Sequence, residues 1–342
     1  MAAEVDLTIS QGKTFTFAFR WASLPIKYVP IEAVPDTTPL RITSAGHGTL
    51  AVAYDLTTAT YDGSGKDVTA QTTTPYGFTG SPDGTKMYIA GYSETTIFEY
   101  NMNTPYDTQL SIYSGNSLDL SAQGSSVASL APSPDGTRMF VADYDNNYIR
   151  QINFATPWDI TTATPQSGGF FVTEGNPRDV DFRMDGTKMY ILGDATDFEV
   201  FQYTLSTPWD LSTATYDGVS LTVGGSGFFG SVVEQDETPQ GVCFSNGGDL
   251  MFMIGSGDDN IYRYEMTTPW DLSTCSYTGT SFNVGNVDGT PRDVAFSPDA
   301  SHLYVVGSGN GQVYRYKLQT KDMFMLTQFG LGTMLAVPMG RF

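Results

Sequence analysis

Ser81-Pro82-Asp83-Gly84-Thr85 is the stretch that decides the fold, because the chain carries four further versions of it. The third residues of the five versions are Asp83, Asp135, Asp185, Gly247 and Asp299, which lie 52, 50, 62 and 52 residues apart. A period of about fifty residues, with one insertion, indicates a repeat architecture in which each unit packs against its neighbours. The further versions read Ser-Pro-Asp-Gly-Thr at 133–137, Arg-Met-Asp-Gly-Thr at 183–187, Ser-Asn-Gly-Gly-Asp at 245–249 and Ser-Pro-Asp-Ala-Ser at 297–301.

Each repeat contains four segments with the character of a β-strand. A short apolar segment precedes the turn, as at 293–296, and a β-rich run follows it, as at 189–193. The third segment alternates, as in Ile-Tyr-Arg-Tyr at 261–264, and a second repeated turn separates it from the fourth. That turn reads Thr-Pro-Trp-Asp at 156–159, 207–210 and 268–271 and Thr-Pro-Tyr-Asp at 104–107. Four strands per fifty residues predict an all-β chain built from β-propeller blades.

The two ends of the repeat predict how the ring closes. Residues 55–63 nearly copy the fourth segment at 210–218, but no first three segments precede them. The last repeat ends near Leu318 after only three segments. Pairing of 55–70 beside 312–318 would complete the last blade and remove two exposed sheet edges. We therefore expect a five-bladed β-propeller over residues 55–320, closed by an N-terminal strand.

Composition excludes several classes of function. The chain has 37 acidic and 17 basic residues, and its 20 net negative charges disfavour binding of nucleic acid. With two cysteines and two histidines, we expect neither a disulfide framework nor a His/Cys zinc site. The repeated turns occur in every blade, whereas catalysis needs one asymmetric set of residues. We therefore expect a non-enzymatic protein without a metal or cofactor.

The segments on either side of the repeats do not follow the repeat pattern. We expect a small N-terminal β segment in residues 1–54 and an extended, apolar C-terminal tail in residues 321–342. Apolar side chains on this scale outside a closed ring indicate contacts with other chains, the alternative being that both ends pack on the propeller or on each other. The residues expected in assembly contacts are Phe15, Phe17, Phe19 and Trp21 in the first segment and Phe324, Phe329, Leu335 and Phe342 in the second.

The N-terminal residues resemble a known family. The stretch Asp-Leu-Thr-Ile-Ser-Gln-Gly-Lys-Thr-Phe at 6–15, Phe-Arg-Trp at 19–21, Pro-Leu-Arg-Ile-Thr at 39–43 and Gly-His-Gly at 46–48 resemble the N-terminal segment of tailed-bacteriophage structural proteins. The resemblance covers about fifty residues, and in that family the segment is an attachment module that precedes varied domains. The blades resemble the broad family of propeller repeats with a Ser-Pro-Asp-Gly turn, which implies fold more than function.

The resemblance implies a structural component of a bacteriophage virion. Its expected place is the tail, baseplate or fibre region, with decoration of the head as the alternative, and the propeller serves as scaffold or host-recognition module. Other virion structural proteins are the implied partners, and we expect a homo-oligomer assembled in the host cytoplasm. An acidic chain with two cysteines and no export signal at 1–13 agrees with this expectation.

One face of the predicted propeller is the candidate recognition surface. Because strands alternate in direction, the loops between second and third strands share a face with the loops between blades. These loops vary from blade to blade, and variable loops on a rigid scaffold are typical sites of recognition. Aromatic and Asp side chains there suit a glycan of the host surface. The candidate binding residues are Tyr92, Tyr144, Asp145, Asp197, Phe228, Phe229, Asp258 and Asp259.

Two other functions are alternatives to a virion role. A lectin-like, carbohydrate-binding propeller would use the same variable loops. A five-bladed glycoside hydrolase would need two carboxylates that flank a sugar. Asp179 and Asp293 occupy matching places in first strands near the axis, but Gly77, Ser129 and Gly241 hold that place in the other blades. This pattern does not assign an acid and a nucleophile.

Overall fold

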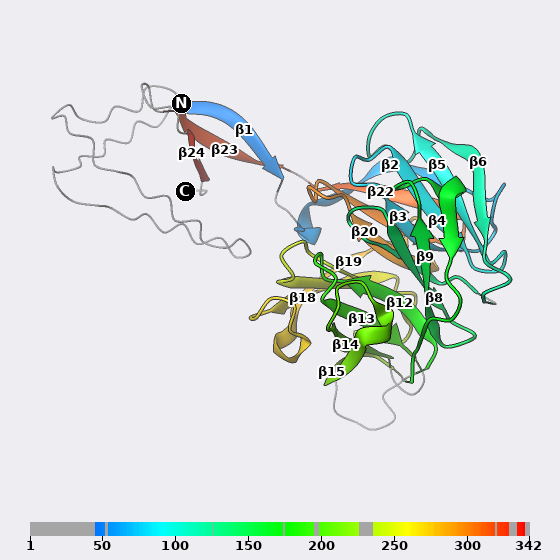
Figure 1. Ribbon diagram of the computed structural model, residues 1–342. Coiled ribbons are helices and arrows are strands. Elements are labelled where there is room, and N and C mark those ends of the chain that lie inside the picture. Colours follow the sequence, from blue (N-terminus) through cyan, green and yellow to red (C-terminus); the bar gives the residue numbers. More distant parts are fainter. Residues whose placement is uncertain are drawn as a thin grey trace, which may run out of the picture. The chain divides into compact units, whose positions relative to one another are not determined.

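The computed structural model describes residues 45–51, 54–124, 126–173, 175–194, 198–225, 235–318, 320–327 and 334–338 (Figure 1). The chain divides into two compact units. One contains the strands that precede and follow the repeats, and the other spans Ala53–Gln319. The predicted assembly residues Phe15, Phe17, Phe19, Trp21, Phe329 and Phe342 lie outside the described residues.

The larger unit is a five-bladed β-propeller, as the repeat predicts. Every blade is an antiparallel sheet that begins with its innermost strand. The first strands of consecutive blades contact one another around the whole ring, including those of the fifth and first blades. The first blade consists of β3 (Pro75–Gly80), β4 (Lys86–Gly91), β5 (Thr96–Met102) and β6 (Ser111–Asp119), and the second of β7 (Ser129–Pro132), β8 (Arg138–Asp143), β9 (Tyr148–Phe154), β10 (Ala163–Pro165) and β11 (Phe170–Phe171). The third blade consists of β12 (Pro177–Phe182), β13 (Lys188–Gly193), β14 (Phe198–Leu205) and β15 (Ala214–Gly224), and the fourth of β16 (Pro239–Phe244), β17 (Leu250–Gly255), β18 (Asn260–Met266) and β19 (Cys275–Asn283). The fifth blade consists of β20 (Pro291–Phe296), β21 (His302–Gly307), β22 (Gln312–Leu318) and β2 (Ala59–Asp67).

The ring closes through the predicted N-terminal strand. β2 pairs antiparallel with β22, from Ala59 opposite Leu318 to Asp67 opposite Gln312. A buried ion pair joins the same two strands, because Arg315 on β22 donates from Nε to the carboxylate of Asp62 on β2. Both groups are withdrawn from water, so their attraction is screened less than that of a surface pair. The closure therefore combines a sheet ladder with a charged contact.

The two repeated turns dock on each other in the first four blades. Trp158 has a positive φ of 59°, and its N–H donates to the carbonyl of Gly136 in the Asp-Gly turn at 3.1 Å. Its ring lies on that glycine so closely that an added Cβ would meet Nε1 at 2.0 Å. Asp159 then accepts from Thr161 N–H at 3.0 Å and caps a single 3-10 turn. Such turns are η1 (Leu56–Thr58), η2 (Ile160–Thr162), η3 (Leu211–Thr213) and η4 (Leu272–Thr274).

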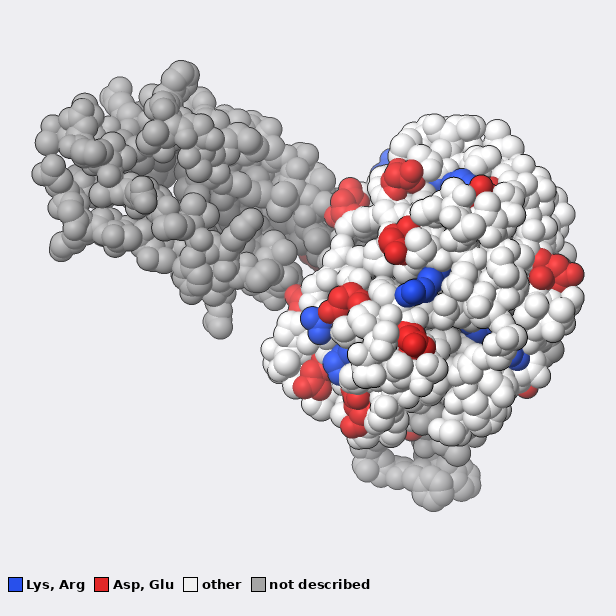
Figure 2. Space-filling model, viewed as in Figure 1, with Lys and Arg blue, Asp and Glu red and all other residues white. Residues whose placement is uncertain are grey.

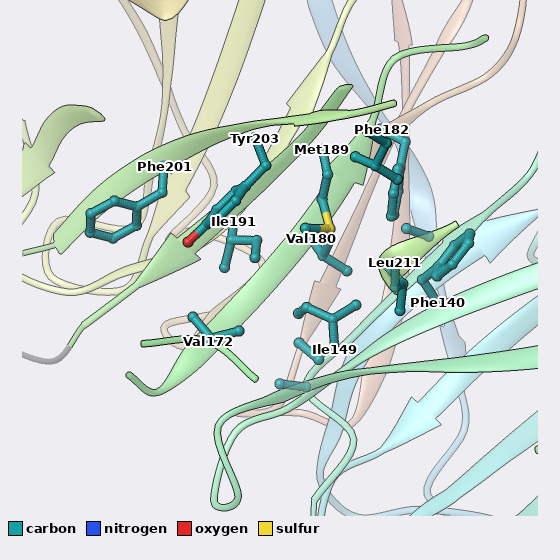
Figure 3. Packing of buried hydrophobic residues seen from close by; sticks show 14 residues of the cluster. Phe140, Ile149, Val172, Val180, Phe182, Met189, Ile191, Phe201, Tyr203 and Leu211 are labelled. Carbon is teal, nitrogen blue, oxygen red and sulfur yellow. The ribbon is translucent and has the colours of Figure 1, made fainter. Parts of the chain in front are cut away.

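The hydrophobic core lies between the blades. Within the described residues, five clusters of buried side chains fill the five interfaces between neighbouring sheets. Figure 3 shows the cluster in which Phe140 and Ile149 of the second blade face Val180 and Met189 of the third. Burial of these apolar faces stabilises each blade only in the presence of its neighbours.

The smaller unit contains one three-stranded sheet. β1 (Ala45–Ala51) pairs antiparallel with β23 (Thr320–Thr327), and β23 pairs with β24 (Met334–Pro338). The segments on either side of the propeller therefore share a sheet. Phe324 stands opposite His47 in this sheet, and Leu335 stands opposite Leu326. Among the described residues, the chain forms no helix with the length and apolar character needed to span a bilayer.

Candidate functional site

Two positions of the repeat build a cavity at the propeller axis. Counting from the third residue of each Asp-Gly turn, the position seven residues earlier lies in or next to the first strand, and the position nine residues later follows the second strand. The cavity has a volume of about 320 Å³ and lies on the face of the variable loops. Its lining residues are Tyr76, Ala128, Arg178, Gln240 and Arg292 from the first position, Tyr92, Tyr144 and Ser256 from the second, and Thr238.

Two arginines converge on one amide in this cavity. Nη1 of Arg178 and Nη1 of Arg292 each donate to Oε1 of Gln240 at 2.9 Å. The amide nitrogen of Gln240 donates to Ser256 Oγ at 3.0 Å and to the Thr238 carbonyl at 3.2 Å. This network fixes the amide so that its oxygen accepts from both guanidinium groups.

The two arginines differ in their remaining partners. Arg178 donates from Nε to Asp194 Oδ2 at 2.6 Å and forms an ion pair with it. Arg292 donates from Nε to the neutral hydroxyl of Ser308 at 2.8 Å and forms no ion pair with any residue that the structure describes. Burial lowers the pKa of the Arg292 guanidinium below its ordinary value. It nevertheless remains cationic at neutral pH, because an arginine pKa starts above 12.

Three tyrosines form an aromatic wall beside the arginines. Tyr76 and Tyr92 stack with ring centroids 4.3 Å apart, and Tyr144 meets Tyr92 edge-on at 6.3 Å. Arg292 lies over the Tyr76 ring at 4.5 Å, and Arg178 lies over the Tyr144 ring at 5.2 Å. Burial raises the pKa of Tyr92 to about 12, so its hydroxyl stays protonated at neutral pH. The cavity thus offers aromatic surfaces, hydroxyl groups and fixed cationic N–H donors to a ligand.

The axial aspartates serve the ring and do not line the cavity. Asp293 accepts from Phe78 N–H of the first blade at 2.8 Å and from Val294 N–H at 2.7 Å. Asp179 likewise accepts from Val242 N–H of the fourth blade at 2.6 Å and from Val180 N–H at 2.7 Å. Burial raises the pKa of both carboxyl groups. Every carboxyl oxygen of the pair therefore already accepts a backbone hydrogen bond, and the pair ties neighbouring blades together.

The structure places the predicted binding residues in different environments. Tyr92 and Tyr144 line the axial cavity. Asp145 is exposed at its rim, where it accepts from Tyr92 Oη at 3.5 Å. Asp258 and Asp259 lie between β17 and β18 and do not line the cavity. Asp197, Phe228 and Phe229 lie outside the described residues.

Sequence reasoning did not identify Arg178, Gln240 and Arg292 as site residues. The signal was present, because aligning the blades on their Asp-Gly turns places these three residues in one column with Tyr76 and Ala128. The five blades are similar at most aligned positions but carry different side chains at this one, and such a variable position is a candidate for a specific site. Its location at the axis follows only from closure of the ring.

Figure 2 shows acidic side chains scattered over the propeller face in view, with fewer basic ones. Among the described residues, no group of three or more His, Cys, Asp or Glu side chains is placed to hold a metal ion. The axial cavity is therefore the candidate functional site.

Comparisons with known proteins give similarities of fold. No protein-family model and no curated protein matches the chain. Among solved structures, it is similar to the periplasmic gluconolactonase of Pseudomonas aeruginosa, with 17% identity, a TM-score of 0.40 and coverage of 78% of this chain and 70% of that one. A Bacteroides fragilis protein provisionally assigned as a 6-phosphogluconolactonase gives 14% identity, a TM-score of 0.43 and coverage of 75% and 67%. Hydrazine synthase of Kuenenia stuttgartiensis gives 12% identity, a TM-score of 0.42 and coverage of 75% of this chain and 99% of that one. Identities and TM-scores this low carry no inference about activity.

Proposed function

We propose that the chain is a non-enzymatic recognition component of a tailed-bacteriophage particle, and that its propeller binds a host surface glycan in the axial cavity. The observation that carries the glycan part is the composition of the cavity, which combines a wall of three tyrosines with guanidinium and hydroxyl groups. Aromatic rings pack on the apolar face of a sugar, while hydroxyl and guanidinium groups bond its hydroxyls. The virion part rests on the resemblance of residues 6–48 to phage attachment segments.

The glycan part is tested by binding of the full-length chain to an array of bacterial surface saccharides. Tyr92→Ala and Tyr144→Ala should each weaken binding of any saccharide that the wild-type chain retains. Tyr216→Ala is the matched control, because Tyr216 is 41% exposed on the outermost strand β15 and far from the lining residues in its blade. Binding that survives both cavity substitutions, or an array without any bound saccharide, would contradict the proposal.

The virion part is tested in particles. If residues 1–50 attach the propeller to other virion proteins, a chain lacking them should fold and yet be missing from purified particles. The copy number of the wild-type chain per particle reports the symmetry of the expected homo-oligomer. Normal incorporation of the shortened chain would overturn the attachment role and leave the glycan site to be judged on its own.

A further inference from the structure

The arrangement of charges in the axial cavity indicates more about a ligand than the presence of a general sugar site does. The chain carries 20 net negative charges, yet two guanidinium groups share one neutral acceptor at the axis. Asp194 forms an ion pair with Arg178. Arg292 is a half-buried cation whose hydrogen-bond acceptors are a hydroxyl and an amide, and the nearby carboxylate of Asp288 attracts it without forming an ion pair. A partly desolvated cation without a directly paired carboxylate is costly, and a bound anion lowers that cost.

The remaining donors of the two arginines are positioned for such an anion. Nε and Nη1 are engaged in both residues, whereas Nη2 of neither arginine donates to a residue that the structure describes. Each guanidinium group also lies over a tyrosine ring, Arg292 over Tyr76 and Arg178 over Tyr144. Both side chains are therefore oriented before a ligand arrives, which lowers the entropic cost of binding it.

The charge balance favours a carboxylate over a phosphate. The two guanidinium groups have one carboxylate in direct contact, that of Asp194, and Asp288 adds a weaker attraction to Arg292, so at most about one positive charge is left in the cavity. A carboxylate carries one negative charge and matches the forked donors of arginine. A phosphate monoester carries nearly two charges at neutral pH and would remain under-neutralised. The volume of about 320 Å³ is near the lower end of ligand pockets, which suits one sugar residue.

We propose that the axial cavity recognises an acidic sugar, such as a uronic acid residue, through its carboxylate. Resting on the proposed function, this inference names the class of glycan. Arg292 supplies the charge that has no directly paired carboxylate, and Arg178 supplies the second donor. Tyr92 contacts the sugar ring, and Ser256 contributes a hydroxyl for the sugar hydroxyls.

The test compares matched probes on the full-length chain by calorimetry. Methyl glucuronoside and methyl galacturonoside carry the carboxylate, methyl glucoside and methyl galactoside carry a hydroxymethyl group in its place, and glucose 6-phosphate carries a dianion. We expect at least one uronoside to bind about tenfold or more tightly than its neutral partner, with an affinity that falls as salt is added. Arg292→Gln should abolish this preference, and Arg292→Lys should restore only part of it. Arg183→Gln is the control, because Arg183 is a half-exposed cation on the Asp-Gly turn face.

A second variant keeps the proposal testable should substitutions of Arg292 disturb folding. Gln240→Glu puts a carboxylate between the two guanidinium groups, so it should abolish the preference for uronosides, and thermal unfolding of the variant shows whether its fold is retained. Equal binding of acidic and neutral glycosides would overturn the acidic-sugar assignment while leaving the glycan site intact. Tighter binding of glucose 6-phosphate than of either uronoside would overturn the carboxylate assignment. Absence of binding to all five probes would contradict both this inference and the axial glycan site.

Discussion

Tyr190 donates a hydrogen bond from its hydroxyl to the backbone carbonyl of Trp270 at 2.7 Å, and this bond joins the third blade to the fourth. Tyr190 stands five residues after the third residue of its Asp-Gly turn. At the same position, Tyr88 donates to the carbonyl of Trp158 and Tyr304 to that of Tyr106. The other two blades carry phenylalanine, which contacts the equivalent ring of the next blade without a hydrogen bond; these pairs are Phe140 with Trp209 and Phe252 with Tyr54.

Tyr190→Phe should lower the free energy of unfolding by about 1–3 kcal/mol, because it leaves a buried carbonyl without its partner. Urea unfolding measures the change. Tyr61→Phe is the control, since Tyr61 is 38% exposed on the closing strand β2, and its effect should stay within about 0.5 kcal/mol. Equal losses in the two variants would show that the bond between blades contributes nothing of its own.

Two glycines with positive φ predict a second difference, Gly136 in an Asp-Gly turn and Gly218 within strand β15. Gly136 and Gly218 have positive φ values of 68° and 72°, but only Gly136 lies under a ring, that of Trp158. Gly218→Ala should therefore cost about 1–2 kcal/mol from the backbone alone, and Gly136→Ala about 2 kcal/mol more, because the ring must move. Chemical denaturation of the two variants measures this difference. Similar costs would mean that the contact of the Trp158 ring with the turn is unimportant for stability.

The fifth blade allows the opposite change, from alanine to glycine, to be tested at the same turn position. Ala300 occupies the glycine position of the turn with a positive φ of 53°. Ala300→Gly should raise the free energy of unfolding by up to about 1 kcal/mol, since glycine adopts this conformation without strain. A decrease measured by the same denaturation assay would contradict the strain at this position.

The charged contact at the ring closure predicts a large effect of Arg315. Its removal by Arg315→Met leaves Asp62 and Asp107 without their guanidinium partner, so we expect a loss of about 3 kcal/mol or more. Limited proteolysis should then cut near β2 before it cuts the other blades. Arg183→Met breaks the exposed pair with Asp185 and should cost less than about 1 kcal/mol. If proteolysis of Arg315→Met began elsewhere, the contact would not hold the closing strand.

The axial aspartates predict a pH dependence of stability. Burial raises the pKa of Asp293 from its ordinary value of 3.8 to about 7. The folded chain then holds a proton that the unfolded chain releases, so the contribution of Asp293 to stability is present at low pH and is lost as pH rises from about 4 to about 7. Asp293→Asn should reduce the slope of this part of the profile without removing it, because burial also raises the pKa of Asp179 and Asp181. The substitution also weakens one backbone hydrogen bond.

The matched control for Asp293→Asn is a substitution of Asp159, whose pKa is shifted in the opposite direction. Hydrogen bonds from the side chain and N–H of Thr161 lower the pKa of Asp159, a turn cap at the surface. Asp159→Asn should therefore change stability without altering the slope between pH 4 and pH 7. Denaturation at a series of pH values separates the two variants. An unchanged slope in Asp293→Asn would place the titrating group elsewhere.

The sequence by itself determined the blade number, the strand order and the closing strand. These features depend on local turn chemistry and on repetition along the chain: an Asp-Gly turn is recognisable within five residues, and the orphan copy at 55–63 has only one incomplete blade to join. Tyr92 and Tyr144, which line the axial cavity, were also predictable as candidate residues, because they lie in loops that vary among the repeats.

Tertiary structure alone decided which of those loops form a site. Arg178, Gln240 and Arg292 are more than fifty residues apart in sequence, and only closure of the ring brings one residue from each blade to a common axis. The same closure gave Asp179 and Asp293 backbone donors in neighbouring blades and so removed them from the surface of the cavity. Hydrogen bonds and charge balance across an axis depend on distances between blades, and a one-dimensional pattern does not contain those distances.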